Sequence, residues 1–144
     1  MQFFLSLNPP TTTHQMKAVR VVNGKPHFYE PRDLAQARAT LMACLSQFRP
    51  SAPIEPPIRL TVKWLFPLSG KHRNGEYRTS RPDTDNLQKL LKDCMTRLGF
   101  WRDDAEVASE IVEKFWADTP GIFVSAVQIP PQEPRHGQNG AGVG

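Results

Sequence analysis

The sequence contains few cysteines and has no long hydrophobic run. Its two cysteines, Cys44 and Cys94, lie far apart and neither belongs to a Cys-x-x-Cys pair. This pattern argues against a disulfide framework and indicates small core residues of a protein in a reducing compartment. The apolar start, residues 2–7, lacks a basic leader and is too short to be a signal or membrane segment. We therefore expect a cytoplasmic protein without a membrane partner.

The length and the charge balance favour a single domain with an anionic partner. A chain of 144 residues can bury one hydrophobic core without disulfides or a structural metal, and a second domain is not expected. The formal net charge is +4, which favours anionic partners through long-range steering. Nucleic acid ranks first among these partners, ahead of an anionic membrane surface.

Apolar periodicity predicts a mixture of strands and helices. Alternation of apolar and polar residues indicates strands, and recurrence every three or four residues indicates helices. Strands are expected at residues 2–7, 16–22, 25–29, 58–66, 105–116 and 122–129, and helices at residues 32–47 and 86–98. The last two strands are expected to pair antiparallel across the turn at residues 118–121. The expected fold class is α/β (α+β), with a mixed sheet of about four to six strands and two principal helices.

Two glycine positions mark turns, and the end of the chain differs in composition. Asn23-Gly24 supplies the positive backbone angles that a two-residue hairpin turn requires, and Gly99 fits a helix C-terminal cap. Residues 130–144 are rich in proline, glutamine and glycine, with almost no apolar side chains to offset the entropy of ordering. We expect a domain of residues 1–129 followed by a disordered tail of residues 130–144.

An acidic motif precedes the second expected helix. In the run Arg-Pro-Asp-Thr-Asp-Asn-Leu-Gln-Lys at residues 81–89, Asp83 and Asp85 lie two residues apart and Lys89 follows. Carboxylates held close together repel each other, so a divalent cation is a natural reason to gather them. The lysine adds a charge suited to an anionic substrate. A structural interpretation stays open, in which Asp85 caps the helix with Gln88 and Lys89 forms an ion pair with Asp85.

A second acidic pair, Asp103-Asp104, follows the end of that helix. Such pairs are commonly solvated turn residues. A straight helix over residues 86–98 would rise about 20 Å, which places Asp104 at the opposite end from the first two aspartates. Either Asp104 of a second subunit completes the site in a two-fold dimer, or a returning strand folds Asp104 back under the start of its own helix.

The segment that leads into the acidic motif is basic. Residues 69–81 contain glycine and no apolar periodicity, and are expected to form an exposed loop. Its cations, Lys71, Arg73, Arg78 and Arg81, suit phosphate contacts that position DNA without reading its sequence. The alternative is an ordinary solvated loop.

Several aromatic and histidine residues receive no functional assignment. Trp64, Phe100 and Trp101 are expected in the core or at a dimer contact, and not as platforms for stacked bases. His14 and His72 lack a second ligand at metal spacing, so neither is assigned to zinc.

Two linked motifs resemble the RusA family of Holliday-junction resolvases. The first is Asp-Thr-Asp-Asn-Leu-Gln-Lys at residues 83–89, and the second is Gly-Phe-Trp-Arg-Asp-Asp-Ala-Glu-Val at residues 99–107. The segment Asn-Pro-Pro-Thr at residues 8–11 is similar to the opening loop of that family. Two motifs at matching separation are more specific than either motif alone.

The resemblance implies a homodimeric, Mg²⁺-dependent endodeoxyribonuclease of phages or bacteria, with Mn²⁺ as a substitute cation and no small-molecule cofactor. It would resolve four-way DNA junctions by paired symmetric nicks that leave 5′-phosphate and 3′-hydroxyl ends, in recombination and repair. The family's catalytic aspartates carry over to Asp83, Asp85 and Asp104, which would bind the metal. Its essential lysine carries over to Lys89.

Two other functions remain open from the sequence. One is a non-catalytic protein that binds branched DNA, in which the aspartates only cap a helix and solvate a turn. The other is a nuclease that acts on other branched or flapped DNA. Mg²⁺-dependent cutting of a four-way junction separates the first of these from a resolvase.

Overall fold

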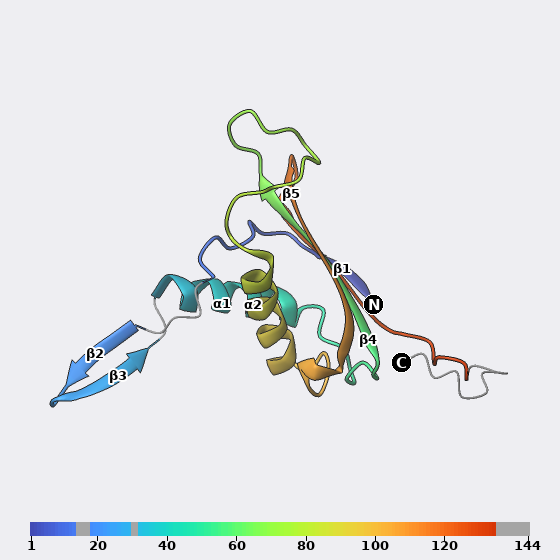
Figure 1. The fold of residues 1–144 in the computed structure, drawn as a ribbon, viewed down its shortest axis with the longest axis horizontal. Helices are drawn as coiled ribbons and strands as arrows, with labels where there is room; N and C mark the ends of the chain where they lie inside the picture. The colour runs from blue at the N-terminus through green and yellow to red at the C-terminus, as the bar shows by residue number, and fades with distance from the viewer. Residues whose placement is uncertain (14–17, 30–31, 135–144) are drawn as a thin grey trace, which may run out of the picture.

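The computed structural model of the protein describes residues 1–13, 18–29 and 32–134, although the side chains of residues 18–20 and 27–29 are not described. Its elements in chain order are β1 (Gln2–Leu5), β2 (Ala18–Val22), β3 (Lys25–Tyr29), α1 (Arg32–Ser46), β4 (Ile58–Pro67), α2 (Thr84–Arg97), the 3₁₀ helix η1 (Asp104–Glu106), β5 (Val107–Ala117) and β6 (Gly121–Gln128). Both α-helices lie on one face of a four-stranded sheet (Figure 1). The expected class, with a mixed sheet and two principal helices, is confirmed. Most of the tail that we expect to be disordered, residues 135–144, lies outside the described residues.

The four-stranded sheet has the order β1-β6-β4-β5. Strand β4 pairs antiparallel with β6 and parallel with β5, and β1 completes the sheet beside β6. The expectation that β5 and β6 pair with each other is wrong, because β4 lies between them. Strand β4 lies inside the sheet, and buried residues alternate with more exposed ones along its whole length. One face of the strand therefore packs into the hydrophobic core.

The β2–β3 hairpin extends away from the sheet and the helices (Figure 1). Its turn has the predicted geometry, with φ of 52° at Asn23 and 75° at Gly24. Within the described residues, β2 and β3 pair only with each other. In the same part of the chain, no helix is both long enough and apolar enough to cross a membrane.

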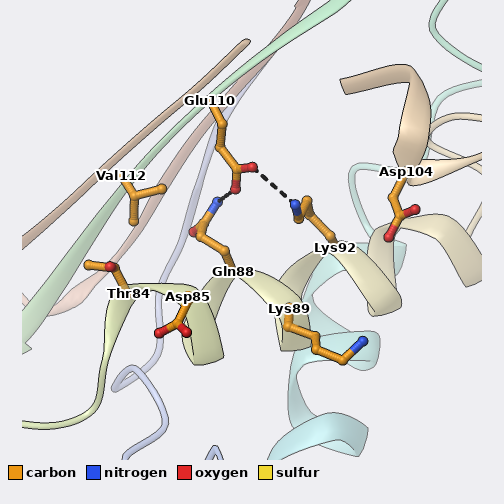
Figure 2. A pocket seen from close by; sticks show the side chains of 8 residues that line it. All are labelled: Thr84, Asp85, Gln88, Lys89, Lys92, Asp104, Glu110 and Val112. Atoms are coloured by element: carbon orange, nitrogen blue, oxygen red, sulfur yellow. Dashed lines mark hydrogen bonds and ion pairs between the residues drawn. The ribbon is translucent and has the colours of Figure 1, made fainter. Parts of the chain in front are cut away.

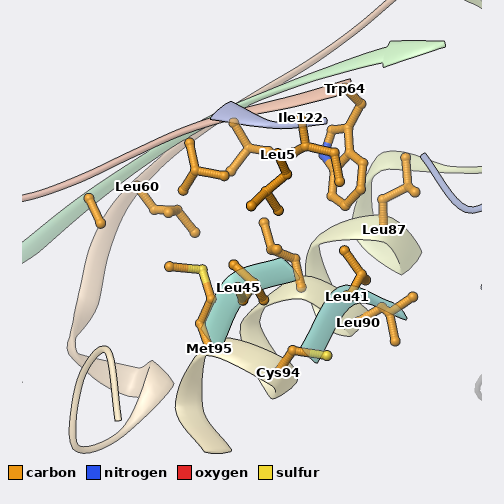
Figure 3. Packing of buried hydrophobic residues seen from close by; sticks show 14 of the residues in the cluster. Leu5, Leu41, Leu45, Leu60, Trp64, Leu87, Leu90, Cys94, Met95 and Ile122 are labelled. Carbon is orange, nitrogen blue, oxygen red and sulfur yellow. The ribbon is translucent and has the colours of Figure 1, made fainter. Parts of the chain in front are cut away.

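The hydrophobic core fills the space between the sheet and the two helices (Figure 3). The fully buried side chains that meet there include Leu60, Trp64 and Ile122 from the strands, Leu41 and Leu45 from α1, and Leu87, Leu90, Cys94 and Met95 from α2. Each large apolar side chain contributes about 1.5–3 kcal/mol on burial. Burial also raises the pKa of the Cys94 thiol to about 11. This packing fixes α2 against the sheet.

Three aromatic residues on β4 and just after α2 also belong to the core. Trp64, Phe100 and Trp101 are at most 1% exposed, which confirms that they are core residues and not base-stacking platforms. Gly99, with φ of 79°, ends α2 as predicted, and the backbone N–H of Phe100 donates to the Met95 carbonyl at 3.0 Å. The chain therefore reverses tightly after α2 and leads directly to Asp103 and Asp104.

Candidate active site

A polar pocket of about 470 Å³ lies along one side of α2. Its lining residues are Thr84, Asp85, Gln88, Lys89 and Lys92 of α2, Asp104 of η1, and Glu110 and Val112 of β5. Figure 2 shows Asp85 near the start of the helix and Asp104 at the other end of the pocket, with the lysines between them. The 14 residues of α2 rise about 21 Å at about 1.5 Å per residue. The pocket thus has an aspartate at each end, with Lys89 and the Lys92–Glu110 ion pair between them.

The carboxylates of Asp83 and Asp85 make no hydrogen bond or ion pair with the described residues. Asp83 is the N-cap residue of α2, yet its side chain does not bond to the first turn. The interpretation of Asp85 as the cap is wrong, because the helix already begins at Thr84 and Gln88 bonds elsewhere. Both side chains are exposed near the positive end of the helix dipole, which stabilises anions. They remain free to bind a cation.

The two aspartates do not line the same depression. Asp85 faces the main pocket, whereas Asp83 lines a separate small pocket of about 40 Å³ with Thr11, Thr13 and Arg81 among its neighbours. Pro82 and the backbone of the preceding loop therefore set the position of Asp83, and α2 sets the position of Asp85.

Gln88 links the core to the wall of the main pocket. Its side chain is only 3% exposed, its Oε1 accepts from Trp64 Nε1 at 2.8 Å, and its Nε2 donates to Glu110 Oε2 at 2.7 Å. The other Glu110 oxygen accepts from Lys92 Nζ at 3.0 Å (Figure 2). Neither Glu110 nor Lys92 is among the residues predicted from the sequence. Helical spacing was the available signal for Lys92, because residues 85, 88, 89 and 92 share one face of a helix.

Lys89 lies in the middle of the pocket and is weakly paired. Its Nζ is 3.8 Å from Asp93 Oδ2, and its side chain is 57% exposed. The alternative interpretation, in which Lys89 forms an ion pair with Asp85, does not hold, because the contact is with Asp93. An exposed pair at this distance contributes only a few tenths of a kcal/mol, so the ammonium is available to an anionic ligand.

Asp103 and Asp104 have different environments. The Asp103 carboxylate accepts from the Ala105 backbone N–H at 2.8 Å and caps η1, whereas Asp104 is exposed and lines the main pocket. Within the described ranges, no three His, Cys, Asp or Glu side chains gather closely enough to hold a metal ion. A single chain thus does not fold Asp104 back to the start of α2, contrary to the returning-strand alternative.

Comparison with known proteins assigns these residues to a family. Residues 8–126 match the family described as Endodeoxyribonuclease RusA, and this range contains every carboxylate and lysine discussed above. The chain belongs to the RusA family.

Two relatives of this RusA-family endodeoxyribonuclease cover most of its length. The protein named crossover junction endodeoxyribonuclease rusA of Lactococcus phage r1t is 35% identical over 108 residues, which are 74% of this chain and 81% of the phage protein. The uncharacterized protein YqaN of Bacillus subtilis (strain 168) is 28% identical over 118 residues, which cover 74% of this chain and 82% of that protein.

The basic loop of this RusA chain contains two kinds of cation. Lys71, Arg73 and Arg81 are exposed, as phosphate contacts require. Arg78 instead places its guanidinium carbon 4.2 Å from the centroid of the Phe66 ring and 4.5 Å from that of Trp116, and burial lowers its pKa. Arg78 therefore packs against aromatic rings and is less exposed than the other three cations, which leaves its predicted DNA contact a prediction.

The loop also holds His72 in an internal contact. The His72 ring stacks on Trp116 with centroids 4.2 Å apart, and its Nδ1 contacts the Glu76 carboxylate. The backbone of residues 75–78 bonds to β5, where Gly75 N–H donates to the Trp116 carbonyl at 2.8 Å. The loop is therefore packed along the outer edge of β5 and leads to Asp83 in a defined position.

Proposed function

We propose that this RusA-family chain is a Mg²⁺-dependent endonuclease that resolves four-way DNA junctions by paired symmetric nicks in recombination and repair. The observation that carries the proposal is the pair of unpartnered carboxylates, Asp83 and Asp85, at the start of the helix that places Lys89 in the main pocket. Family membership and the name of the phage relative support DNA as the substrate and a junction as its form. The products would carry 5′-phosphate and 3′-hydroxyl ends.

The carboxylate oxygens of Asp83 and Asp85 are ligand atoms of the type that Mg²⁺ binds. Carboxylate oxygens are the hard ligands that Mg²⁺ prefers, and Mn²⁺ accepts the same ligands. Asp83 and Asp85 would hold the ion, since neither carboxylate is engaged within the described chain. Bound there, the ion supplies Lewis-acid stabilisation of the charge that develops on a phosphodiester under attack.

Lys89 would contact the scissile phosphate. Its ammonium lies in the pocket between Asp85 and Asp104 (Figure 2), and within the described residues only the weak contact with Asp93 competes for it. A lysine in that position donates to a non-bridging phosphate oxygen and stabilises the additional negative charge of the transition state. Lys71, Arg73 and Arg81 would hold the adjacent DNA backbone and supply affinity without sequence reading.

Asp104 of a second copy would complete the site. The length of α2 separates Asp85 from Asp104 within one chain, and the described residues contain no three-ligand group. In a two-fold dimer, the Asp104 end of each chain can meet the Asp83 and Asp85 end of its partner, which creates two equivalent sites. Two such sites account for paired nicks in opposing strands.

The test is nicking of a synthetic four-way junction with and without Mg²⁺. Wild-type protein is expected to cut only with the cation, and Asp83→Asn is expected to lose at least about 100-fold in rate. Asp118→Asn, in the exposed turn before β6, is the matched control and should cut like wild type. Junction binding without any Mg²⁺-dependent cut would contradict the proposal. Faster cutting of a flap than of the junction would assign the site to another branched substrate.

A further inference from the structure

We infer that Lys114 is a positioning residue that, together with Arg78, holds the backbone that presents Asp83 to the cation. The inference rests on the proposed cation role of Asp83. Lys114 lies on β5, outside both sequence motifs, and touches neither the main pocket nor the second acidic pair.

Three consecutive carbonyl groups before Asp83 each accept a hydrogen bond from a cation. Lys114 Nζ donates to the Ser80 carbonyl at 2.7 Å and to the Pro82 carbonyl at 2.8 Å. The Arg78 guanidinium donates to the carbonyl of Arg81, which lies between them. Each of residues 80–82, which lead into Asp83, is therefore held by a hydrogen bond to its carbonyl group.

Both cations are themselves held in place. Lys114 is part of β5, where it lies opposite Trp64 of the central strand β4, and its carbonyl accepts from the Arg78 N–H at 3.0 Å. The rings of Phe66 and Trp116 pack against the Arg78 guanidinium. Burial lowers the pKa of both side chains. Hydrogen bonds from partly desolvated cations are stronger than those between neutral groups. Lys114 and Arg78 therefore form a stiff clamp on the carbonyls of residues 80–82.

The clamp matters for Asp83 because, among the described residues, no hydrogen bond or ion pair holds its carboxylate. Its carboxylate makes no cap bond to α2, so its direction depends on the backbone that precedes it. The charge of Asp83 also acts on Lys114, whose pKa it raises against the larger effect of burial. If Lys114 is removed, residues 80–82 lose two of their three bonds to cations, and the backbone that positions Asp83 is held less firmly.

The experiment is direct binding of Mn²⁺ by the full-length protein, measured from the electron paramagnetic resonance signal of free Mn²⁺. Lys114→Met is expected to weaken binding about 10-fold or more, as loss of an orienting group does at metal sites. Lys114→Arg keeps the donors and should recover most of the affinity. Lys63→Met, which removes an exposed lysine from β4, is the matched control and should bind like wild type.

A double mutant separates positioning from general stability. In the Asp83→Asn background, Lys114→Met should weaken Mn²⁺ binding no further, because the ligand that it positions is already gone. An equal loss in both backgrounds, or no loss from Lys114→Met alone, would overturn the clamp and leave the cation role of Asp83 intact. If Asp83→Asn alone leaves Mn²⁺ binding unchanged, Asp83 is not a ligand, and both the clamp and the proposed function are overturned.

Folding of each variant is checked by circular dichroism at the assay temperature. If Lys114→Met does not fold, Lys114→Gln replaces it, since its amide can still donate to one of the two carbonyls. That variant is expected to bind Mn²⁺ with an affinity between those of wild type and Asp83→Asn. Wild-type affinity in a folded Lys114→Gln protein would overturn the inference.

Discussion

At the start of α2, Asp83 occupies a capping position without making the capping bond. An N-cap aspartate usually contributes about 1 kcal/mol through a bond to the first turn. A side chain that leaves this contribution unused, next to an equally unpartnered Asp85, is available for a ligand. The sequence identified both aspartates as candidates. It could not say which one occupies the cap, because the first residue of a helix is uncertain by one or two positions from sequence.

Gln88 gives a test of the network beneath the site. Gln88→Leu keeps the volume but removes the acceptor of the buried Trp64 indole N–H and a donor to Glu110. A buried donor without a partner costs about 1–3 kcal/mol, so we expect the free energy of unfolding in urea to fall by that amount. Gln36→Leu, on the exposed side of α1, is the control and should change it little. Equal stability of both variants would mean that the Trp64–Gln88 bond contributes nothing.

Among the elements, the helices and the strands of the main sheet follow from local patterns, whereas the strand order does not. The stripe of α2 and the alternation of β4 appear directly in the sequence and are buried as expected. The parallel pairing of β5 with β4 joins segments separated by α2, so no short-range pattern reports it. Gly121 is a further example: a side chain there would lie 2.7 Å from the Leu5 carbonyl oxygen. That close approach exists only because β1 pairs with β6.

Removal of cations from the basic loop is expected to have two separable effects, one on the salt dependence of junction binding and one on the stability of the fold. Lys71→Ala combined with Arg73→Ala should lower the slope of log K against log salt for junction binding by about 1.8, at about 0.9 per phosphate contact. Arg78→Ala should leave this slope unchanged and lower the stability of the fold by about 1 kcal/mol, because its guanidinium packs on aromatic rings. Fluorescence anisotropy without divalent cations measures the slope. If only Arg78→Ala changed the slope of log K against log salt, Arg78 and not Lys71 or Arg73 would be the DNA contact.

For the whole molecule, the central proposal is a cation site for which one chain supplies only part of the ligands. The rise of a helix was sufficient to predict that Asp104 lies far from the start of α2, and the described residues contain no three-ligand group. The sequence could not show what supplies the missing ligand, because contacts between chains leave no periodic signal within one of them. We therefore propose that a second copy contributes its Asp104.

Complementation between two inactive chains tests this claim most directly. An Asp83→Asn chain and an Asp104→Asn chain, each with a different affinity tag, are mixed, and the heterodimer is purified on both tags. In a shared arrangement, one of its two sites combines the intact Asp83 of one chain with the intact Asp104 of the other. A mixture of Asp83→Asn with Asp85→Asn is the matched control, since both changes lie at the same end of α2 and no intact site can form.

We expect the first heterodimer to nick one strand of a four-way junction in the presence of Mg²⁺, while each homodimer and the control heterodimer stay inactive. Absence of nicking by the purified first heterodimer would contradict this expectation and place all the functional ligands within a single chain.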